Sequence, residues 1–239
     1  MSALKRFFVD KIEPALYLEG EEFEHAKNVL RIGVGAEIIL LDNSGKEYTG
    51  VVAQVEKKRM LVNIVREEVG TREAQTQVTL LFGYLKNADK NEFIVQKAVE
   101  LGVQEIGVFS SQFSSAYINE NKLERLNKVA KEAAKQCLRA TAPIVKYYGN
   151  LDDALASAMD AEYKLFACEF AAESETDIAT VNSSTAIVIG SEGGFSEEEA
   201  QNAKQKGYAW VTLGKRILRA ETAAVALTSV VMFALGEWR

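Results

Sequence analysis

A change of hydrophobic pattern along the chain limits the folds that this sequence can adopt. Up to about residue 68, the apolar residues form short β-rich runs separated by turn signals such as Asp42-Asn43-Ser44-Gly45. After a polar stretch at residues 67–77, strands alternate with helices, which predicts a mainly parallel sheet with helices on both faces. We therefore expect an α/β protein with two domains, residues 1–70 and residues 71–239.

The expected elements follow from the spacing of apolar residues within each domain. The first domain should form a small β-barrel with a short helical insert at residues 21–30 and strands at residues 7–9, 36–41, 48–55 and 60–65. The second domain should have strands at residues 78–84, 106–110, 164–168, 186–190 and 209–213. Its helices are expected at residues 89–102, 122–138, 197–206 and 221–235. Two of these helices begin with the spacing of a capping box, Asp89 with Glu92 and Ser196 with Glu199.

Charge and cysteine content restrict the class of protein. A formal net charge of -6 argues against general electrostatic binding of nucleic acid, unless the Lys and Arg residues cluster in space. The two cysteines, Cys137 and Cys168, are far apart in the sequence, which favours a reducing compartment over a disulfide framework. We expect a cytoplasmic protein.

The chain has no segment with the properties of a membrane anchor. Residues 1–10 contain Lys5 and Arg6 before only three apolar residues, which is not the pattern of a signal peptide. The weakly polar segment at residues 223–236 is too short to span a bilayer and is typical of a buried helix. No membrane role is expected.

Three glycines lie between a predicted strand and a predicted helix, in the sequence IVIGSEGGF at residues 187–195. Glycines at this place allow a ligand to approach the backbone, but a tight turn explains them equally well. The spacing is not that of a dinucleotide fingerprint, and Arg216 after Gly214-Lys215 excludes a Walker loop. The single histidine, His25, excludes a histidine-based metal site or a histidine triad in the α/β part, so no metal is expected.

A second connection between a strand and a helix has the sequence LGKRILRAET at residues 213–222. Each of its polar residues has a structural explanation as well as a functional one. Glu221 suits a helix N-terminus, Thr222 could cap that helix, and Arg219 could pair with Glu221 without touching a substrate. The residues alone leave both interpretations open.

Together with IGSEGGFS, this segment resembles the last two knot motifs of the RsmE family of SPOUT-class ribosomal RNA methyltransferases. The resemblance continues in the same order over nearly the full chain. It includes RFFV at residues 6–9, HAKNVLR at 25–31, DNSGKEY at 42–48, KNEFIVQKAVELGV at 90–103 and KEAAKQCLRATAP at 131–143.

The resemblance implies both a fold and an activity. The implied fold is a PUA-like β-barrel RNA-binding domain followed by a trefoil-knotted SPOUT methyltransferase domain that forms a homodimer. The implied activity is transfer of a methyl group from S-adenosylmethionine to N3 of a uridine in small-subunit (16S) ribosomal RNA. The partner would be 16S ribosomal RNA in the small ribosomal subunit.

The resemblance also implies which residues form the site. The cofactor would be held by Glu169, Gly190, Glu192, Gly193, Gly194, Leu213, Gly214, Ile217 and Leu218. Leu213, Ile217 and Leu218 would form an apolar surface for adenine. Arg219 is the candidate for orienting the base or stabilising its carbonyl oxygens, and Glu221 for accepting a proton or holding Arg219. The candidates for contact with RNA are Arg6, Arg31, Lys86, Lys90 and Arg139.

Five positions depart from the usual family pattern and keep alternatives open. Ser191 and Lys215 stand where the family usually has Pro, Ala220 where it usually has Thr, and Gln112-Phe113-Ser114 where it tends to have Glu-Arg-Ser. One alternative is a non-catalytic ribosome-assembly protein of the same fold that binds RNA. Others are a methyltransferase acting on another RNA or base atom and, more remotely, a nicotinamide-dependent enzyme.

Overall fold

The computed structural model describes residues 4–114, 116–171 and 173–238, which divide into two compact units. The first unit contains the chain up to Glu73 together with Ala134–Ala142. The second contains Ala74–Ala133 and the chain from Pro143 onward. The division expected from the sequence places Ala134–Ala142 in the second domain, whereas these residues group with the first unit.

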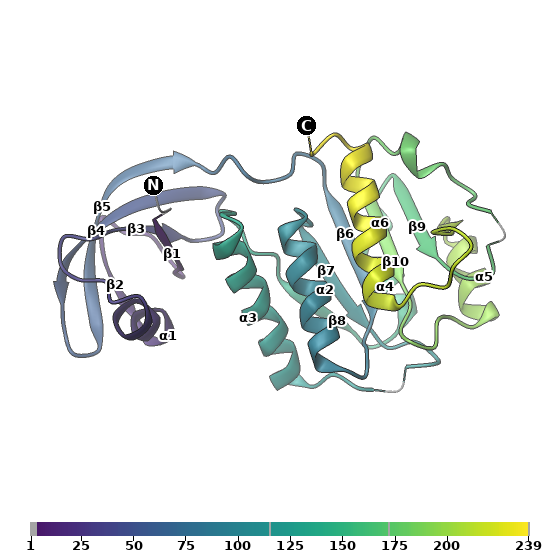
Figure 1. Ribbon diagram of the computed structural model, residues 1–239, viewed down its shortest axis with the longest axis horizontal. Helices are drawn as coiled ribbons and strands as arrows, with labels where there is room; N and C mark the ends of the chain where they lie inside the picture. Colours follow the sequence, from purple (N-terminus) through teal and green to yellow (C-terminus); the bar gives the residue numbers. More distant parts are fainter. Residues whose placement is uncertain (1–3, 115, 172, 239) are drawn as a thin grey trace. The chain divides into compact units, whose positions relative to one another are not determined.

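The first unit is built on one sheet of five strands (Figure 1). The strands are β1 (Lys5–Phe8), β2 (Ala15–Glu19), β3 (Glu37–Leu41), β4 (Lys46–Val55) and β5 (Arg59–Val69). They pair in the order β1-β3-β4-β5-β2, with β1 parallel to β3 and the other pairs antiparallel. Among the described residues β1 and β2 do not pair, so the sheet does not close into a hydrogen-bonded barrel as the sequence suggested.

The core of the first unit is formed by side chains from all five strands and the helical insert. The insert consists of the short helix α1 (Gly20–Glu24) and one π-helical turn (His25–Val29). Phe23 of α1 is buried with Phe7, Leu40 and Val62 of the sheet. An apolar helix face therefore covers an apolar sheet face.

A buried ion pair fastens Ala134–Ala142 to the rest of the first unit. The Nη2 atom of Arg139 lies 2.8 Å from Oε2 of Glu73, and the Arg139 side chain is only 3% exposed. The other carboxylate oxygen accepts the N–H groups of Ala140 and Thr141. Burial alone would raise the pKa of Glu73, but the charge and hydrogen bond of Arg139 and the bonds from Thr141 outweigh it and lower the pKa.

The second unit contains a six-stranded sheet in which every pairing is parallel. Its strands are β6 (Val78–Gly83), β7 (Glu105–Phe109), β8 (Val145–Tyr148), β9 (Tyr163–Ala167), β10 (Thr185–Ile189) and β11 (Ala209–Val211). The order across the sheet is β11-β9-β10-β6-β7-β8. The expected parallel α/β sheet is confirmed.

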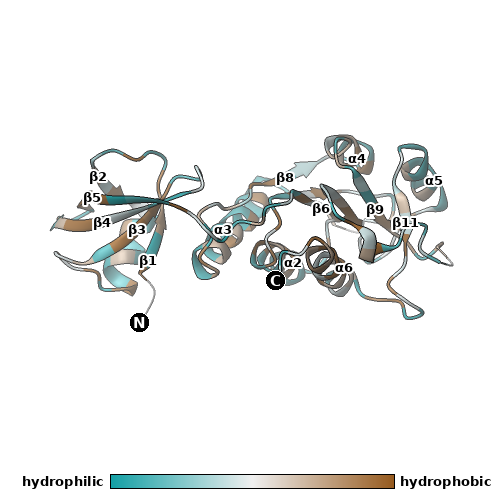
Figure 2. Ribbon diagram, turned by 90° about the horizontal axis from the view of Figure 1, so that it is seen from above, coloured by the Kyte–Doolittle hydropathy of each residue, from teal (hydrophilic) through white to brown (hydrophobic). Residues whose placement is uncertain are grey.

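Helices cover both faces of this sheet. Figure 2 shows α4 (Leu151–Ser157) and α5 (Glu197–Gln205) on one side, and α2 (Ala88–Glu100) and α6 (Ala220–Ala234) on the other. The helix α3 (Glu120–Gln136) and a 3-10 turn (Ile178–Thr180) complete the helical elements described. Alternate strand residues point to opposite faces, so Leu81, Phe166 and Val188 pack with α4 and α5 in one cluster.

Two predicted helix starts have different outcomes. At α5 the Ser196 hydroxyl accepts the N–H of Glu199 while the Glu199 carboxylate accepts the N–H of Ser196, so the predicted capping box is confirmed. At α2 the predicted box is wrong. The cap is Asn87, whose side chain accepts the N–H of Asp89.

Replacing Glu73 with Gln removes the negative charge that lies against the buried Arg139 guanidinium. We expect Glu73→Gln to lower the free energy of unfolding by about 2 kcal/mol, because a buried cation loses its countercharge. Urea denaturation followed by circular dichroism measures this change. Glu67→Gln is a matched control, since its exposed pair with Lys46 should leave stability unchanged within error.

The same variant should show a defined pH dependence. A lowered pKa in the folded protein means that the stabilising carboxylate is present above its ordinary pKa of 4.5 and is lost as the pH falls through the folded pKa. The stability difference between wild type and Glu73→Gln should therefore shrink in acid. A difference that stays constant as Glu73 becomes protonated would contradict the assignment.

Candidate active site

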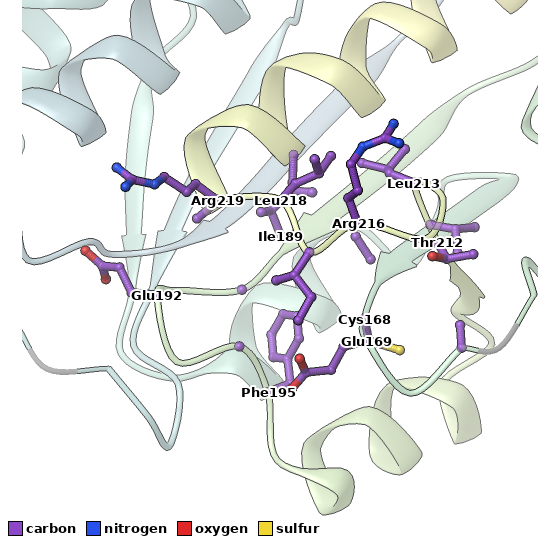
Figure 3. A pocket seen from close by; sticks show the side chains of 18 of the residues that line it. Cys168, Glu169, Ile189, Glu192, Phe195, Thr212, Leu213, Arg216, Leu218 and Arg219 are labelled. Atoms are coloured by element: carbon purple, nitrogen blue, oxygen red, sulfur yellow. The ribbon is translucent and has the colours of Figure 1, made fainter.

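Three loops at one edge of the parallel sheet line a single pocket of about 760 Å³ (Figure 3). They follow β9, β10 and β11, three strands that lie near one another in the second unit. Because parallel strands end at the same edge, their following loops converge there. The volume is within the range of small-molecule sites, roughly 300–1,000 Å³.

Every residue proposed from the sequence for the cofactor lines this pocket. Glu169 comes from the loop after β9, and Gly190, Glu192, Gly193 and Gly194 from the loop after β10. The loop after β11 supplies the remaining positions, Leu213, Gly214, Ile217 and Leu218. The structure thus brings together residues from three distant parts of the chain.

The glycine loop after β10 is compact and its backbone is exposed to the pocket. Gly194 donates its N–H to the carbonyl of Ser191 at 3.0 Å and has a φ of +66°, a conformation that costs little only for glycine. A Cβ at Gly190 would lie 3.1 Å from the Cα of Gly194, so a side chain there would crowd the turn. Both glycines allow the chain to turn within the pocket wall.

The glycine loop is also attached to the chain after β6. The Oε1 atom of Glu192 accepts the backbone N–H of Lys86 at 3.0 Å. In Figure 3 the Glu192 side chain lies at one side of the pocket, on the same side as Arg219. Glu192 therefore has a structural role in holding the loop as well as its place in the pocket lining.

The loop after β11 contributes apolar side chains. Ile217 is 89% exposed, and Leu213 and Leu218 are partly buried. Water at such an exposed apolar side chain is displaced favourably by an apolar ligand surface. This part of the pocket is suited to an aromatic ring system.

The two proposed catalytic residues lie where this loop enters α6. Arg219 occupies the N-cap position without a side-chain capping bond, and its guanidinium makes no hydrogen bond within the described part of the chain. Glu221 lies in the first turn, and its Oε1 is 2.8 Å from Nζ of Lys90 on α2. Neither residue caps the helix with its side chain, and Glu221 pairs with Lys90 rather than forming an ion pair with Arg219.

The pKa of Glu221 determines what its carboxylate can do. Burial alone would raise it, but the hydrogen bond from Lys90, a backbone N–H and the charges of Lys90 and Arg219 outweigh burial and lower it. Glu221 is therefore ionised at neutral pH and is a weak base. Its geometry favours an electrostatic role over proton acceptance.

The sequence missed several pocket residues that have no chemical motif. Cys168 and Phe170 line the pocket because they follow β9 directly. Their position after a strand is the one sequence feature that could have predicted this. Burial raises the pKa of the Cys168 thiol, which disfavours a nucleophilic thiolate. Lys90, proposed for RNA, also lines the pocket through its contact with α6.

The basic residues proposed for RNA in the first unit differ in their environment. Arg31 is exposed and has a φ of 55°. Arg6 pairs with Glu47 at 2.8 Å and its side chain is 9% exposed. Arg139 is buried in an ion pair with Glu73, so it has a structural role that does not require contact with RNA. Of these three, only Arg31 has an exposed side chain.

The other two RNA candidates lie in the second unit, beside the pocket. Lys86 is exposed, and its backbone N–H donates to Glu192. Lys90 is partly buried and pairs with Glu221. The five basic residues are therefore divided between the two units. Lys86 is the one of this pair that is accessible to a polyanion.

The described residues contain neither a candidate metal site nor a candidate membrane-spanning helix. No group of three or more His, Cys, Asp or Glu side chains there could hold a metal ion. None of the described helices combines the length and apolar character needed to cross a bilayer.

Comparison with known proteins identifies the family. A family model described as an RNA methyltransferase domain matches residues 72–232, and one described as an RNA methyltransferase PUA domain matches residues 18–65. Ribosomal RNA small subunit methyltransferase E of Bacillus subtilis is 30% identical, with 96% of each chain covered. The chain belongs to the RsmE family. The resemblance seen in the sequence motifs is confirmed.

Two further relatives extend this result. The enzyme of the same name from Mesomycoplasma hyopneumoniae is 38% identical over 69% of this chain and 73% of its own. The crystal structure of ribosomal RNA small subunit methyltransferase E from Neisseria gonorrhoeae bound to S-adenosyl methionine has a TM-score of 0.85 at 29% identity. The two structures match over 95% of this chain and 96% of the Neisseria gonorrhoeae chain.

Gly194 provides a test of the loop geometry. Gly194→Ala should lower the free energy of unfolding by about 1 kcal/mol, because a side chain disfavours its left-handed backbone. Gly149→Ala is the control, since its backbone is not left-handed and a Cβ there meets nothing within 4 Å. Thermal unfolding of both variants measures the difference. Equal stability in the two variants would show that the Gly194 conformation is not required.

Proposed function

We propose that this protein transfers a methyl group from S-adenosylmethionine to N3 of a uridine in small-subunit (16S) ribosomal RNA. The observation that carries the proposal is the pocket formed by the three loops after β9, β10 and β11 in a chain of the RsmE family. The non-catalytic alternative has no support among the relatives compared, which are named as methyltransferases.

The residues of the pocket fit S-adenosylmethionine. The exposed Ile217, with Leu213 and Leu218, offers an apolar surface for adenine, and the glycine loop offers backbone polar groups at close approach. Glu169 supplies an acidic side chain at the pocket wall, suited to a hydroxyl or ammonium group. Gly190, Gly193 and Gly194 have no side chains, so the backbone of this loop itself lines the pocket.

When bound, S-adenosylmethionine supplies a methyl group activated by its sulfonium leaving group. The protein then has to align the uracil N3 with this methyl group and favour release of the imide proton to solvent. We assign Arg219 to the carbonyl oxygens of uracil, where its guanidinium stabilises negative charge as the proton leaves. The lowered pKa of Glu221 favours a positioning role, in which its carboxylate holds Lys90 and adds to the field around Arg219.

We also propose how the two domains divide these tasks. Residues 1–70 form the RNA-binding PUA-like domain, and residues 71–239 form a methyltransferase domain with a trefoil knot. The sequence motifs of the family support both assignments. The exposed residues Arg31 and Lys86 are the best-placed phosphate contacts of the five proposed. We place the enzyme in the cytoplasm, where its ribosomal substrate is found.

Methyl transfer is the direct test of the proposed reaction. Purified protein should methylate small ribosomal subunits from cells that lack the modification, and mapping of the product should show 3-methyluridine at one position. A methyl group on another base atom would contradict the N3 assignment. RNA binding without any transfer would revive the assembly-factor alternative.

Arg219→Ala tests the proposed catalytic role. We expect kcat to fall by roughly 100-fold, as for loss of a donor to developing negative charge, while the affinity for S-adenosylmethionine changes little. Arg125→Ala is the control, because Arg125 is exposed, pairs with Glu92 and does not line the pocket. Wild-type turnover in Arg219→Ala would contradict the assignment.

A homodimer is also proposed, with α6 at the interface. This helix exposes Val230 and Phe233, which are 44% and 56% exposed. Light scattering at micromolar concentration should give the mass of two chains, and Phe233→Glu should reduce it to that of one. Met159→Glu, at another exposed apolar position, should leave the dimer intact. A wild-type monomer would contradict the proposal.

A further inference from the structure

An exposed aromatic side chain, Phe113, packs against a glycine of the pocket wall. Phe113 follows β7 and its side chain is 49% exposed. It packs so closely on the glycine loop that a Cβ at Gly193 would lie 2.7 Å from the Cβ of Phe113 and 3.2 Å from its carbonyl oxygen. Gly193 lines the pocket, so Phe113 is in contact with the pocket wall.

Hydrogen bonds hold the segment that carries Phe113. The backbone N–H of Gln112 donates to Oε1 of Glu199 at 2.8 Å, and that of Ser111 donates to Oγ of Ser114 at 2.8 Å. The Oγ atoms of Ser111 and Ser191 are 3.4 Å apart, which links the segment to the glycine loop. An exposed ring on a fixed backbone loses little conformational entropy when a partner covers it.

The surroundings of Phe113 favour a nucleotide as that partner. Unpaired RNA bases stack on aromatic side chains, and this contact is independent of base identity. Glu192, next to Gly193 in the chain, accepts the N–H of Lys86, and Figure 3 shows Arg219 on the same side of the pocket. Lys86 and Arg219 are both exposed, so their cationic side chains are available to the phosphates of a nucleotide bound at this loop.

We propose that Phe113 stacks on a base of the RNA substrate at the entrance to the pocket. This contact would hold the strand while the target uridine enters, so Phe113 is a substrate-binding residue. The inference builds on the proposed RNA methyltransferase function and adds a specific contact to it. It also gives a role to one of the positions where the chain departs from the family pattern.

The test compares an apolar and an aromatic replacement in the full-length protein. Phe113→Leu keeps an apolar contact with Gly193 but removes the ring, whereas Phe113→Trp keeps an aromatic face. With unmethylated small subunits, we expect Phe113→Leu to raise the KM for RNA at least about fivefold, the lower limit for loss of one stacked base. Phe113→Trp should stay within about twofold of wild type.

Controls separate stacking from an effect on the glycine loop. Affinity for S-adenosylmethionine, measured by calorimetry, should be unchanged in Phe113→Leu. Phe93→Leu, at another exposed aromatic that lies beside Lys97 on α2 rather than on the glycine loop, should have the KM of wild type. An unchanged KM in Phe113→Leu, an equal loss in Phe113→Trp, or a parallel loss of cofactor affinity would each overturn the proposal.

Direct RNA binding keeps this test independent of turnover. Fluorescence anisotropy with a labelled RNA fragment containing the mapped uridine measures the dissociation constant of each variant. If wild type transfers no methyl group but Phe113→Leu still weakens binding of small-subunit RNA, the proposed reaction fails and the stacking contact stands. If transfer proceeds and the variant binds RNA as wild type does, only the stacking contact fails.

Discussion

Parallel pairing of the six strands in the second unit is the constraint on which the site depends. Parallel strands need long crossovers, and their following loops leave at the same edge of the sheet. The loops after β9, β10 and β11 therefore meet, although they come from separate parts of the sequence. The helices α2 and α6 cover one face of the sheet, and α4 and α5 cover the other (Figure 2). Because helices cover both faces, the pocket lies at the edge of the sheet, where these three loops meet.

Electrostatics at the site are local and do not follow the overall charge. The protein has a net charge of -6, yet Lys86, Lys90 and Arg219 lie at or beside the pocket. The Lys90–Glu221 pair joins the first turns of α2 and α6 and keeps Glu221 ionised. Lys86 and Arg219 are exposed and therefore available to RNA, although the protein as a whole is acidic.

Much of the second unit was predictable because its signals are local. Each pocket loop follows an apolar strand directly, so the positions of Glu169, Gly190 and Leu213 relative to strands were clear from the sequence. The Ser196 capping box was equally clear, since both partners lie within four residues. The strands β2 and β8 and the helix α4 were missed, because all three are short.

Contacts between distant residues could not be predicted from local patterns. The pairing of Lys90 with Glu221 depends on how α2 packs on α6, and the packing of Phe113 on Gly193 depends on the neighbouring loops. The burial of Arg139 against Glu73 follows from the way Ala134–Ala142 joins the first unit. In each case tertiary packing, rather than sequence spacing, determines what the side chain does.

Hydrogen–deuterium exchange with and without S-adenosylmethionine tests most directly whether the three loops form the cofactor site. We expect S-adenosylmethionine to protect residues 168–171, 190–195 and 212–219 from exchange, with little change in the first unit. Protection confined to other segments, or no protection at saturating S-adenosylmethionine, would contradict it.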